Sequence, residues 1–224
     1  MVNRYLMTHS LLRSWLYAMK DDPNADATTE RDHVEEFMKV LRREPTSPSN
    51  AMTKGNDFED LVTAVLYGAP SAVYHRETKE KELIEVHMAT AEHPWYEAAA
   101  NVAARIKGGV LQVKANRVLI VDGTPILLHG RMDALKAGEI FDIKYSSGGY
   151  DVGKFFDSTQ HPAYFELVPE ARSFTYLVSN GSTVWTETYQ REETRSIIPI
   201  ISDFLAWLRD TGRFDVFRQF WKAK

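Results

Sequence analysis

The chain has 224 residues, a net charge of −4, an apolar fraction of 44% and a charged fraction of 26%, values typical of a globular protein with one core. It contains no cysteine, which excludes disulfides, iron–sulfur clusters, cysteine-ligated zinc and thiol nucleophiles. No apolar run reaches the roughly 18 residues of a membrane-spanning helix, and the N-terminus lacks a signal-peptide cleavage site. We therefore expect no membrane association and a cytoplasmic location.

The N-terminal half carries helical patterns. Apolar residues at helical spacing predict helices over residues 10–19, 29–43 and 56–67. Ser10 is the expected N-cap of the first helix, and Gly68 ends the third. Residues 70–107 are expected to be mostly helical, with a break at His93-Pro94.

The pattern changes after Gly108-Gly109, where β-branched residues predict a three-stranded antiparallel meander. Its expected turns are at Asn116-Arg117, 122–124 and Ala137-Gly138. A helical region at about 151–168 follows, then strands near 173–179 and 183–190, then helices at about 194–209 and 213–221. This order predicts a mixed α/β (α+β) fold, with a central mixed β-sheet flanked by helices.

We expect one domain over residues 1–224. Its mainly helical N-terminal part covers 1–107, its sheet core 108–191 and its C-terminal helices 192–224.

The predicted hairpin around Ala137-Gly138 places two acids and a lysine together. If those two residues form the loop, position 136 pairs with 139, and Asp133 lies opposite Asp142. Opposed Cβ atoms in an antiparallel pair are about 5 Å apart, where like charges are destabilising. Lys144 shares the face of Asp142 because side chains alternate along a strand, whereas Ile143 points into the core.

A cation between the two carboxylates would make this pair tolerable, whereas the alternative is an ordinary solvated hairpin face. The strands around the pair are strongly apolar, which favours a central hairpin and argues against solvated acids. Magnesium takes oxygen ligands, and a bound ion could polarise a phosphoryl oxygen and lower the pKa of an attacking water. Lys144 could position that water, and the backbone carbonyl of Ile143 could add a ligand.

Outside the hairpin, Glu59 lies at the edge of the apolar stripe of its helix and is a third candidate carboxylate, or else an ordinary boundary glutamate. Gln160 and Tyr164 are spaced to share one helix face, where they could hold a phosphate or stack on a base. The alternative is a core tyrosine beside a surface glutamine. His161 could contact substrate, although a lone histidine is more often structural.

Residues 101–160 contain eight Lys or Arg and six Asp or Glu, so this region is positive in a chain of net charge −4. No Walker A motif occurs, so nothing indicates an ATP-driven motor.

Four short motifs follow one another in the chain: G-x-x-F-E ending at Glu59, G-R-M-D ending at Asp133, F-D-I-K ending at Lys144, and Q-x-x-x-Y from Gln160 to Tyr164. In this order they resemble the PD-(D/E)XK nuclease superfamily, in particular its RecB-type and Cas4-like exonuclease branch. The segment S-L-L-x-x-W at 10–15 is similar to the N-terminal helix of that branch. The resemblance covers roughly residues 10–190.

The resemblance implies a restriction-endonuclease-like core and a Mg²⁺ or Mn²⁺ cofactor. It implies that Glu59, Asp133 and Asp142 are metal ligands, that Lys144 is catalytic, and that Gln160 and Tyr164 position substrate. We add His161 and Arg131 to the expected substrate-binding residues. The chain departs from Cas4-like proteins in lacking the cysteines of an iron–sulfur cluster, and its flanking helices look like those of stand-alone bacteriophage nucleases.

The expected activity is metal-dependent hydrolysis of DNA by an exonuclease that serves replication, recombination or repair in a bacterial or phage-infected cell. Alternatives are a non-catalytic DNA- or partner-binding module on a nuclease fold and a structure-specific endonuclease. A homo-oligomer and a recombination or replication partner protein are further expectations. The paired acids also predict that metal binding weakens as the pH falls.

Overall fold

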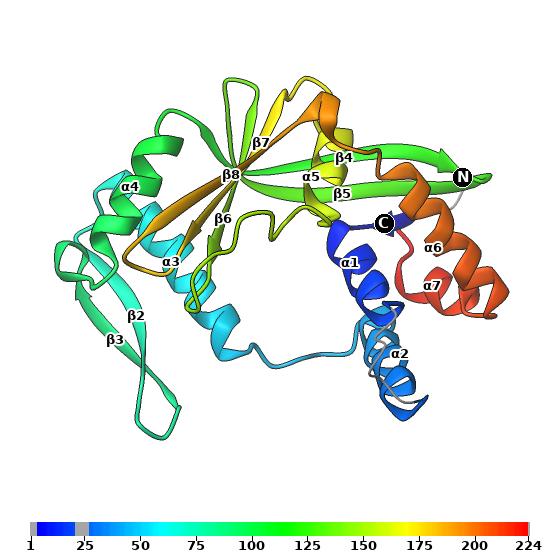
Figure 1. Ribbon diagram of the computed structural model, residues 1–224, viewed down its shortest axis with the longest axis horizontal. Helices are drawn as coiled ribbons and strands as arrows, with labels where there is room; N and C mark the ends of the chain where they lie inside the picture. Colours follow the sequence, from blue (N-terminus) through cyan, green and yellow to red (C-terminus); the bar gives the residue numbers. More distant parts are fainter. Residues whose placement is uncertain (1–3, 21–26, 224) are drawn as a thin grey trace.

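Within residues 4–20 and 27–223, which the computed structural model describes, a six-stranded mixed sheet forms the centre of the molecule and helices flank it (Figure 1). The predicted fold class is therefore confirmed. The strands of this sheet are β1 (Tyr5–Met7), β4 (Val110–Val121), β5 (Thr124–Lys136), β6 (Glu139–Tyr145), β7 (Ser173–Ser179) and β8 (Val184–Gln190).

Strand β5 is the long axis of the sheet. It pairs antiparallel with β4 along most of its length, parallel with β1 through residues 126–128, and antiparallel with β6 at its C-terminal end. Strands β6 and β7 are parallel, and β8 returns antiparallel beside β7.

Two tight turns set this register. At Asp122-Gly123 and at Ala137-Gly138, both central residues have positive φ, which is the type I′ geometry that matches the twist of a hairpin. The expected turns at 122–124 and at Ala137-Gly138 are therefore present.

Seven α-helices and two short 3₁₀ helices occur in the described part of the chain. The α-helices are α1 (His9–Ala18), α2 (Ala27–Leu41), α3 (Asn50–Tyr67), α4 (Tyr96–Ile106), α5 (Gln160–Leu167), α6 (Ile198–Asp210) and α7 (Phe214–Phe220). The 3₁₀ helices are Thr90–Glu92 and Arg191–Glu193.

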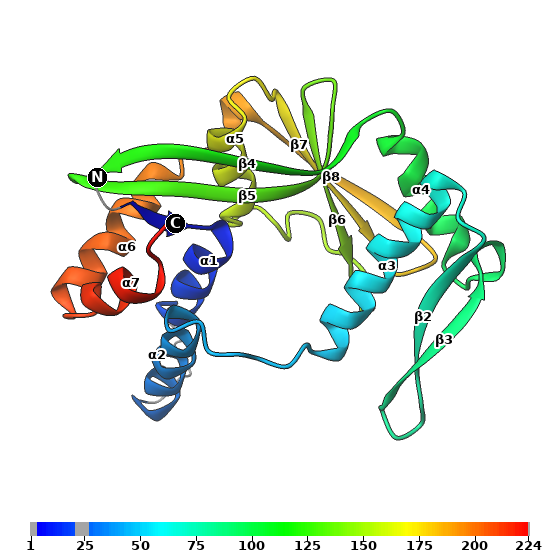
Figure 2. The ribbon, with the colours of Figure 1, turned by 180° about the vertical axis from the view of Figure 1, so that it is seen from behind.

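The sheet separates two hydrophobic cores. The larger packs β1, β5 and one face of β6 and β7 against helices α1, α2, α5, α6 and α7, and the smaller packs the other face of β6 and β7 against α3 and α4. Figure 2, seen from behind, shows α1, α2, α6 and α7 at one end of the molecule and α3 and α4 at the other, with α5 between them. Met132 packs in the larger core and Ala134 in the smaller. The side chains before and after Asp133 therefore point to opposite faces of the sheet, although residues two apart in a regular strand share a face.

The prediction of helix over most of 70–107 is wrong. Residues 71–89 form an antiparallel hairpin of β2 (Ser71–Glu77) and β3 (Leu83–Ala89), which projects from the end of α3 (Figures 1 and 2). Only α4 in this range is an α-helix. The hairpin is fixed by long-range contacts, since the buried carboxylate of Asp57 on α3 accepts hydrogen bonds from the backbone N–H of His75 and pairs with its Nδ1, both at 2.8 Å.

Three smaller predictions also need correction. Asn116-Arg117 is not a turn, because both residues pair with β5 inside the continuous strand β4. Thr8 rather than Ser10 caps α1, its hydroxyl accepting from the backbone N–H of Leu11 at 3.2 Å. Residues 151–159 are irregular, and the helix expected there begins only at Gln160.

The C-terminal elements agree more closely with the sequence patterns. The strands near 173–179 and 183–190 are β7 and β8, and the two final helices are α6 and α7. None of the helices in the described residues is long and apolar enough to cross a membrane.

Candidate active site

The polar site lies where the β5–β6 ladder ends. The register Lys136↔Glu139, Leu135↔Ile140 and Ala134↔Phe141 agrees with the predicted hairpin, and it would next place Asp133 opposite Asp142. Regular pairing stops before that step because β6 continues beside β7 while β5 twists toward β1. Both carboxylates are nonetheless buried at this point, with Asp133 8% and Asp142 3% exposed.

Distortion in the neighbouring strand marks the same place. Gln112 on β4 has a φ of 52°, and it interrupts the ladder between Leu111↔Ala134 and Val113↔Met132. A non-glycine residue with positive φ inside a strand is uncommon and costs free energy. Gln112 lies across from Asp133, because the residues on either side of it pair with Ala134 and Met132.

Asp142 is held by two side chains from different parts of the chain. Lys144 Nζ lies 2.7 Å from its Oδ2, and Gln160 Nε2 donates a hydrogen bond to its Oδ1. The Lys144 contact is an ion pair without regular hydrogen-bond geometry, so Oδ2 is a buried oxygen with no hydrogen-bond partner. Such an oxygen retains the capacity to bind a cation.

Asp133 is held by the backbone of the facing strand. The N–H of Ile143 donates to Asp133 Oδ2 at 2.8 Å. Burial, with repulsion from Asp142 and Glu59, raises the pKa of Asp133 to about 8. Asp133 is therefore mostly protonated at neutral pH when no cation is bound.

The carbonyl of Ile143 has an orientation suited to metal binding. The N–H and C=O of one strand residue point to the same side. Since this N–H meets Asp133, the carbonyl faces the same side, where the β5–β6 ladder has ended. The side chain of Ile143 points the other way, into the smaller core, as predicted.

Lys144 keeps its charge although much of its side chain is covered. Burial alone would lower the pKa of Lys144, but the carboxylates of Asp142, Asp133 and Glu59 overcome this effect and raise the pKa above its ordinary value. The side chain is 33% exposed, so part of it reaches the surface while its ammonium group contacts the buried Asp142.

Glu59 joins the group from α3. Burial raises the pKa of Glu59, and the carboxylate of Asp142 raises it further, whereas Lys144 and Arg131 lower it. These interactions place the Glu59 carboxyl within electrostatic range of Asp142, and its role as a metal ligand stays a prediction.

Helix α5 contributes Gln160 and Tyr164 to the site. Tyr164 is buried, and its hydroxyl donates to the backbone carbonyl of Arg131 at 2.8 Å. Burial, with the charge of Asp142, raises the pKa of this phenol, so it remains a donor at neutral pH. Gly130 makes the approach possible, because a Cβ there would lie 2.4 Å from Tyr164 Cε1. Gln160 and Tyr164 thus share a face as predicted, but both are engaged with the protein.

The remaining predicted substrate-binding residues lie in different surroundings. His161 is not brought to the carboxylates, because its ring is buried, stacks on Tyr189 at a centroid distance of 4.0 Å and contacts the Tyr176 hydroxyl at 3.2 Å. Burial, with the charge of Arg195, lowers the pKa of His161 to about 4. Arg131, by contrast, is exposed on β5 near Asp133, and its positive charge lowers the pKa of Glu59.

His9 is a site residue that the sequence patterns did not reveal. Its ring packs edge-on against Tyr164 at 5.4 Å, and its Nδ1 is buried without a hydrogen-bond partner. Burial and the nearby charges of Lys144 and Arg13 lower the pKa of His9 to about 3. The only local signal was its position at the start of the first predicted helix.

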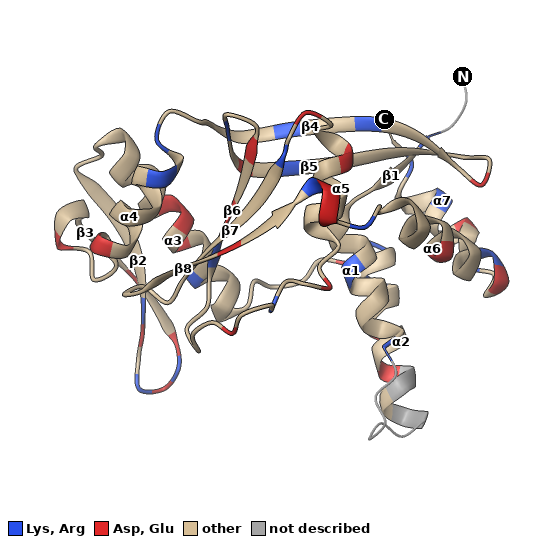
Figure 3. Ribbon diagram, turned by 45° about the horizontal axis from the view of Figure 1, so that its top comes forward, with Lys and Arg blue, Asp and Glu red and all other residues tan. Residues whose placement is uncertain are grey.

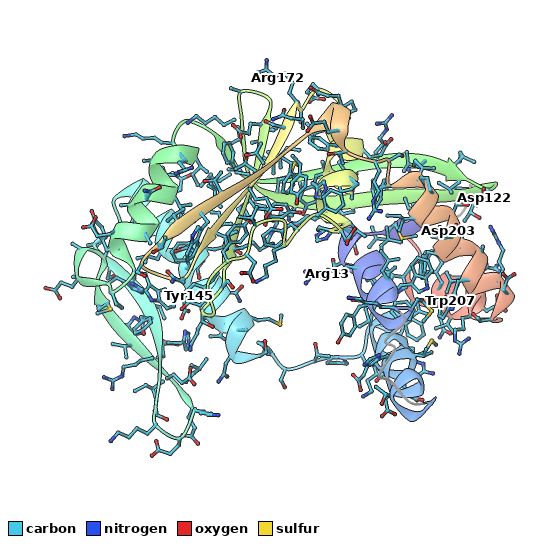
Figure 4. All side chains as sticks on the ribbon, viewed as in Figure 1. Arg13, Asp122, Tyr145, Arg172, Asp203 and Trp207 are labelled. Atoms are coloured by element: carbon cyan, nitrogen blue, oxygen red, sulfur yellow. The ribbon has the colours of Figure 1, made fainter. Side chains whose placement is uncertain are left out.

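Two hollows lie near the site, lined by residues other than Asp133, Asp142, Lys144 and Glu59, and basic residues follow β4 and β5 (Figure 3). Figure 4 labels Arg13 on α1 and Tyr145 at the end of β6, which lie on opposite sides of the space between α1 and α3. A hollow of about 360 Å³ beside Tyr145 includes Lys54 and Ser146, and one of about 640 Å³ beside Arg13 lies between α1 and α2. Figure 3 shows Lys and Arg side by side with few acids along β4 and β5.

The oxygen atoms of the site are of the chemical type that binds a hard divalent cation. Oxygen ligands are what Mg²⁺ and Mn²⁺ prefer, and the site combines the Ile143 carbonyl with three carboxyl groups, one of which, Asp142, has an oxygen that is ion-paired to Lys144 but accepts no hydrogen bond. As the side chains stand, no three His, Cys, Asp or Glu residues in the described ranges are arranged to hold a metal ion. The carboxylates would have to turn from their present partners toward a shared ion.

No protein-family model matches the chain, and no curated protein matches its sequence. Among solved structures, the chain is similar to one described as "Crystal structure of SSO0001", with 13% sequence identity and a TM-score of 0.49. That likeness covers 91% of this chain and 77% of the other.

Proposed function

We propose that this protein is a Mg²⁺- or Mn²⁺-dependent deoxyribonuclease that acts as an exonuclease on DNA ends. One observation carries the proposal. Two buried aspartates converge with a lysine ammonium, and burial, with the like charges of Asp142 and Glu59, raises the pKa of Asp133 to about 8. Burying two acids side by side costs free energy, and a cation between them would offset that cost.

The residues that would hold the ion are Asp133, Asp142 and Glu59, with the Ile143 carbonyl as a further ligand. When bound, the metal would polarise a phosphoryl oxygen and lower the pKa of an attacking water. Hydrolysis adds water across one P–O bond: the water oxygen bonds to phosphorus, and the leaving sugar oxygen takes a proton.

Lys144 is the catalytic residue of this proposal. Its side chain is partly exposed, and its charged ammonium can orient the attacking water or stabilise the negative charge that develops on the phosphoryl oxygens. Asp142 fixes its position through the 2.7 Å ion pair.

Gln160 and Tyr164 are positioning residues in this scheme. Gln160 fixes the orientation of the Asp142 carboxylate, and Tyr164 supports the β5 backbone at Arg131. Arg131 is exposed and free to meet a phosphate, whereas His161 supports the packing of α5.

The test is digestion of end-labelled linear DNA and closed circular DNA with Mg²⁺, Mn²⁺ or EDTA. Wild type should degrade the linear substrate only with metal, and Lys144→Ala should lose at least about 100-fold of the rate. Lys107→Ala, an exposed lysine at the end of α4, is the matched control and should retain full activity.

Two results would redirect the proposal. Cleavage of the closed circle would make the protein an endonuclease. DNA binding without cleavage, unaffected by metal or by Lys144→Ala, would support a non-catalytic binding module, which the net charge of −4 motivates and the intact Glu59, Asp133, Asp142 and Lys144 count against. A cytoplasmic location, a homo-oligomer and a replication or recombination partner remain parts of the proposal.

A further inference from the structure

The segment that joins β6 to α5 exposes two apolar side chains beside the site. Val152 is 94% exposed and Phe156 is 71% exposed. Exposed apolar residues of this size, grouped in one short segment, are typical of contact surfaces. We call residues 146–159 the connecting loop.

The connecting loop is anchored at several points, so the exposure of Phe156 is a fixed feature. The neighbouring Phe155 stacks on the buried Tyr176 ring at a centroid distance of 4.1 Å and an angle of 14°. The Tyr150 hydroxyl donates to Glu187, and the backbone N–H of Phe156 donates to the Gly153 carbonyl at 3.0 Å. Phe155 thus points inward and Phe156 outward from a defined backbone.

Both ends of the connecting loop belong to the candidate active site. It begins directly after Lys144 and Tyr145 and ends at Gln160, which donates to Asp142. Phe156 precedes Gln160 by four residues, so their Cα atoms are at most about 14 Å apart. At about 3.4 Å per stacked nucleotide, this distance covers no more than about four nucleotides.

The connecting loop carries one lysine near Phe156 and two aspartates, one of which is ion-paired. Lys154 is exposed between the two apolar residues, with its Nζ 3.3 Å from Ser146 Oγ. The acidic neighbour Asp157 is paired with Arg195 at 3.7 Å, while Asp151 is exposed. An aromatic ring beside a lysine is the combination that binds single strands, the ring stacking on a base and the cation meeting the backbone.

We propose that Phe156 stacks on an unpaired base of the DNA strand bound at the carboxylate site, within about four nucleotides of the phosphate that is cleaved. The inference rests on the proposed function and adds to it a preference for single-stranded or frayed ends. Val152 widens the apolar surface, and Lys154 contacts the backbone of the same strand.

The test uses Lys144→Ala protein with Mg²⁺, which binds DNA without cleaving it. Oligonucleotides carry the fluorescent base 2-aminopurine at one of the first roughly six positions from either end, a range that includes the four or so nucleotides within reach of Phe156 and positions beyond it. Stacking on Phe156 should quench the label at one position. Adding Phe156→Ala should remove this quenching and weaken single-strand binding at least about 10-fold, while Phe156→Trp retains both.

Two controls separate this inference from the proposed function. Tyr67→Ala removes an aromatic ring of similar exposure (73%) at the far end of α3 and should change neither binding nor quenching. Wild-type cleavage of linear DNA with Mn²⁺ is measured in parallel.

If wild type cleaves DNA but Phe156→Ala binds and quenches as before, the inference is overturned and the proposed function stands. An equal loss on blunt duplex and on single strands would also overturn it, since an unpaired base is then not what Phe156 contacts. If wild type neither binds nor cleaves DNA, both proposals fail.

Discussion

The backbone N–H of Ile143 donates to the side chain of Asp133 across the end of the β5–β6 ladder, at 2.8 Å. This single bond holds one buried carboxyl against a strand that carries another, Asp142, one residue away. Protonation of Asp133, whose pKa is raised, removes the charge repulsion between the two acids, and this links the site to pH.

The first prediction concerns the stability of the metal-free protein. The pKa of Asp133 is raised from 3.8 to about 8, so between these values the folded protein holds a proton that the unfolded chain has released. The free energy of unfolding should therefore fall as the pH rises from about 4 to about 8, by up to about 1.4 kcal/mol per pH unit. Asp133→Asn should remove this part of the pH dependence.

Urea unfolding in the presence of EDTA, at pH 5 and at pH 8, would measure this pH dependence of the free energy of unfolding. Asp151→Asn, which changes an exposed aspartate of the connecting loop, is the control and should leave the dependence as in wild type. An unchanged dependence in Asp133→Asn would show that this carboxyl titrates normally.

The second prediction concerns metal affinity. A ligand carboxyl must lose its proton to bind a cation, so Mn²⁺ should bind at least about 10-fold more tightly at pH 8.5 than at pH 6. Calorimetry in two buffers of different ionisation enthalpy should also detect proton release at the lower pH. Equal affinity at both pH values, without proton release, would contradict the role of Asp133.

The third prediction concerns the contact between β5 and α5. In Gly130→Ala, the new Cβ would lie 2.4 Å from Tyr164 Cε1 and 2.7 Å from Leu167 Cδ1. We expect a loss of about 1–3 kcal/mol in the free energy of unfolding. Gly55→Ala, within α3 and with no atom within 4 Å of the new Cβ, should instead stabilise by about 0.5–1 kcal/mol. Equal effects of the two changes would show that Tyr164 moves aside freely.

The parts of the fold that were predictable depend on local signals. The turn at Ala137-Gly138 and the alternating side-chain directions along β6 follow from neighbouring residues in the sequence. These two features are enough to bring Asp142, Lys144 and Asp133 together. The hairpin of β2 and β3 was misread because glutamate, lysine and methionine favour helices, whereas the contact between Asp57 and His75 joins distant segments.

Roles that depend on packing were beyond the sequence patterns. His9 faces Tyr164 only because α1 packs beside α5, and β1 is too short at three residues to give a strand signal. Spacing could place Gln160 and Tyr164 on one helix face, but it could not say that this face meets Asp142 and the Arg131 carbonyl.

The fourth prediction separates two roles of Gln160. If Gln160 positions Asp142, Gln160→Leu leaves a buried carboxylate oxygen without its donor, and Mn²⁺ affinity in the absence of DNA should fall about 10- to 100-fold. The free energy of unfolding should also fall by about 1–3 kcal/mol. If Gln160 binds substrate instead, metal affinity is unchanged and KM for DNA rises. Gln219→Leu, on the exposed side of α7, is the matched control and should alter neither quantity.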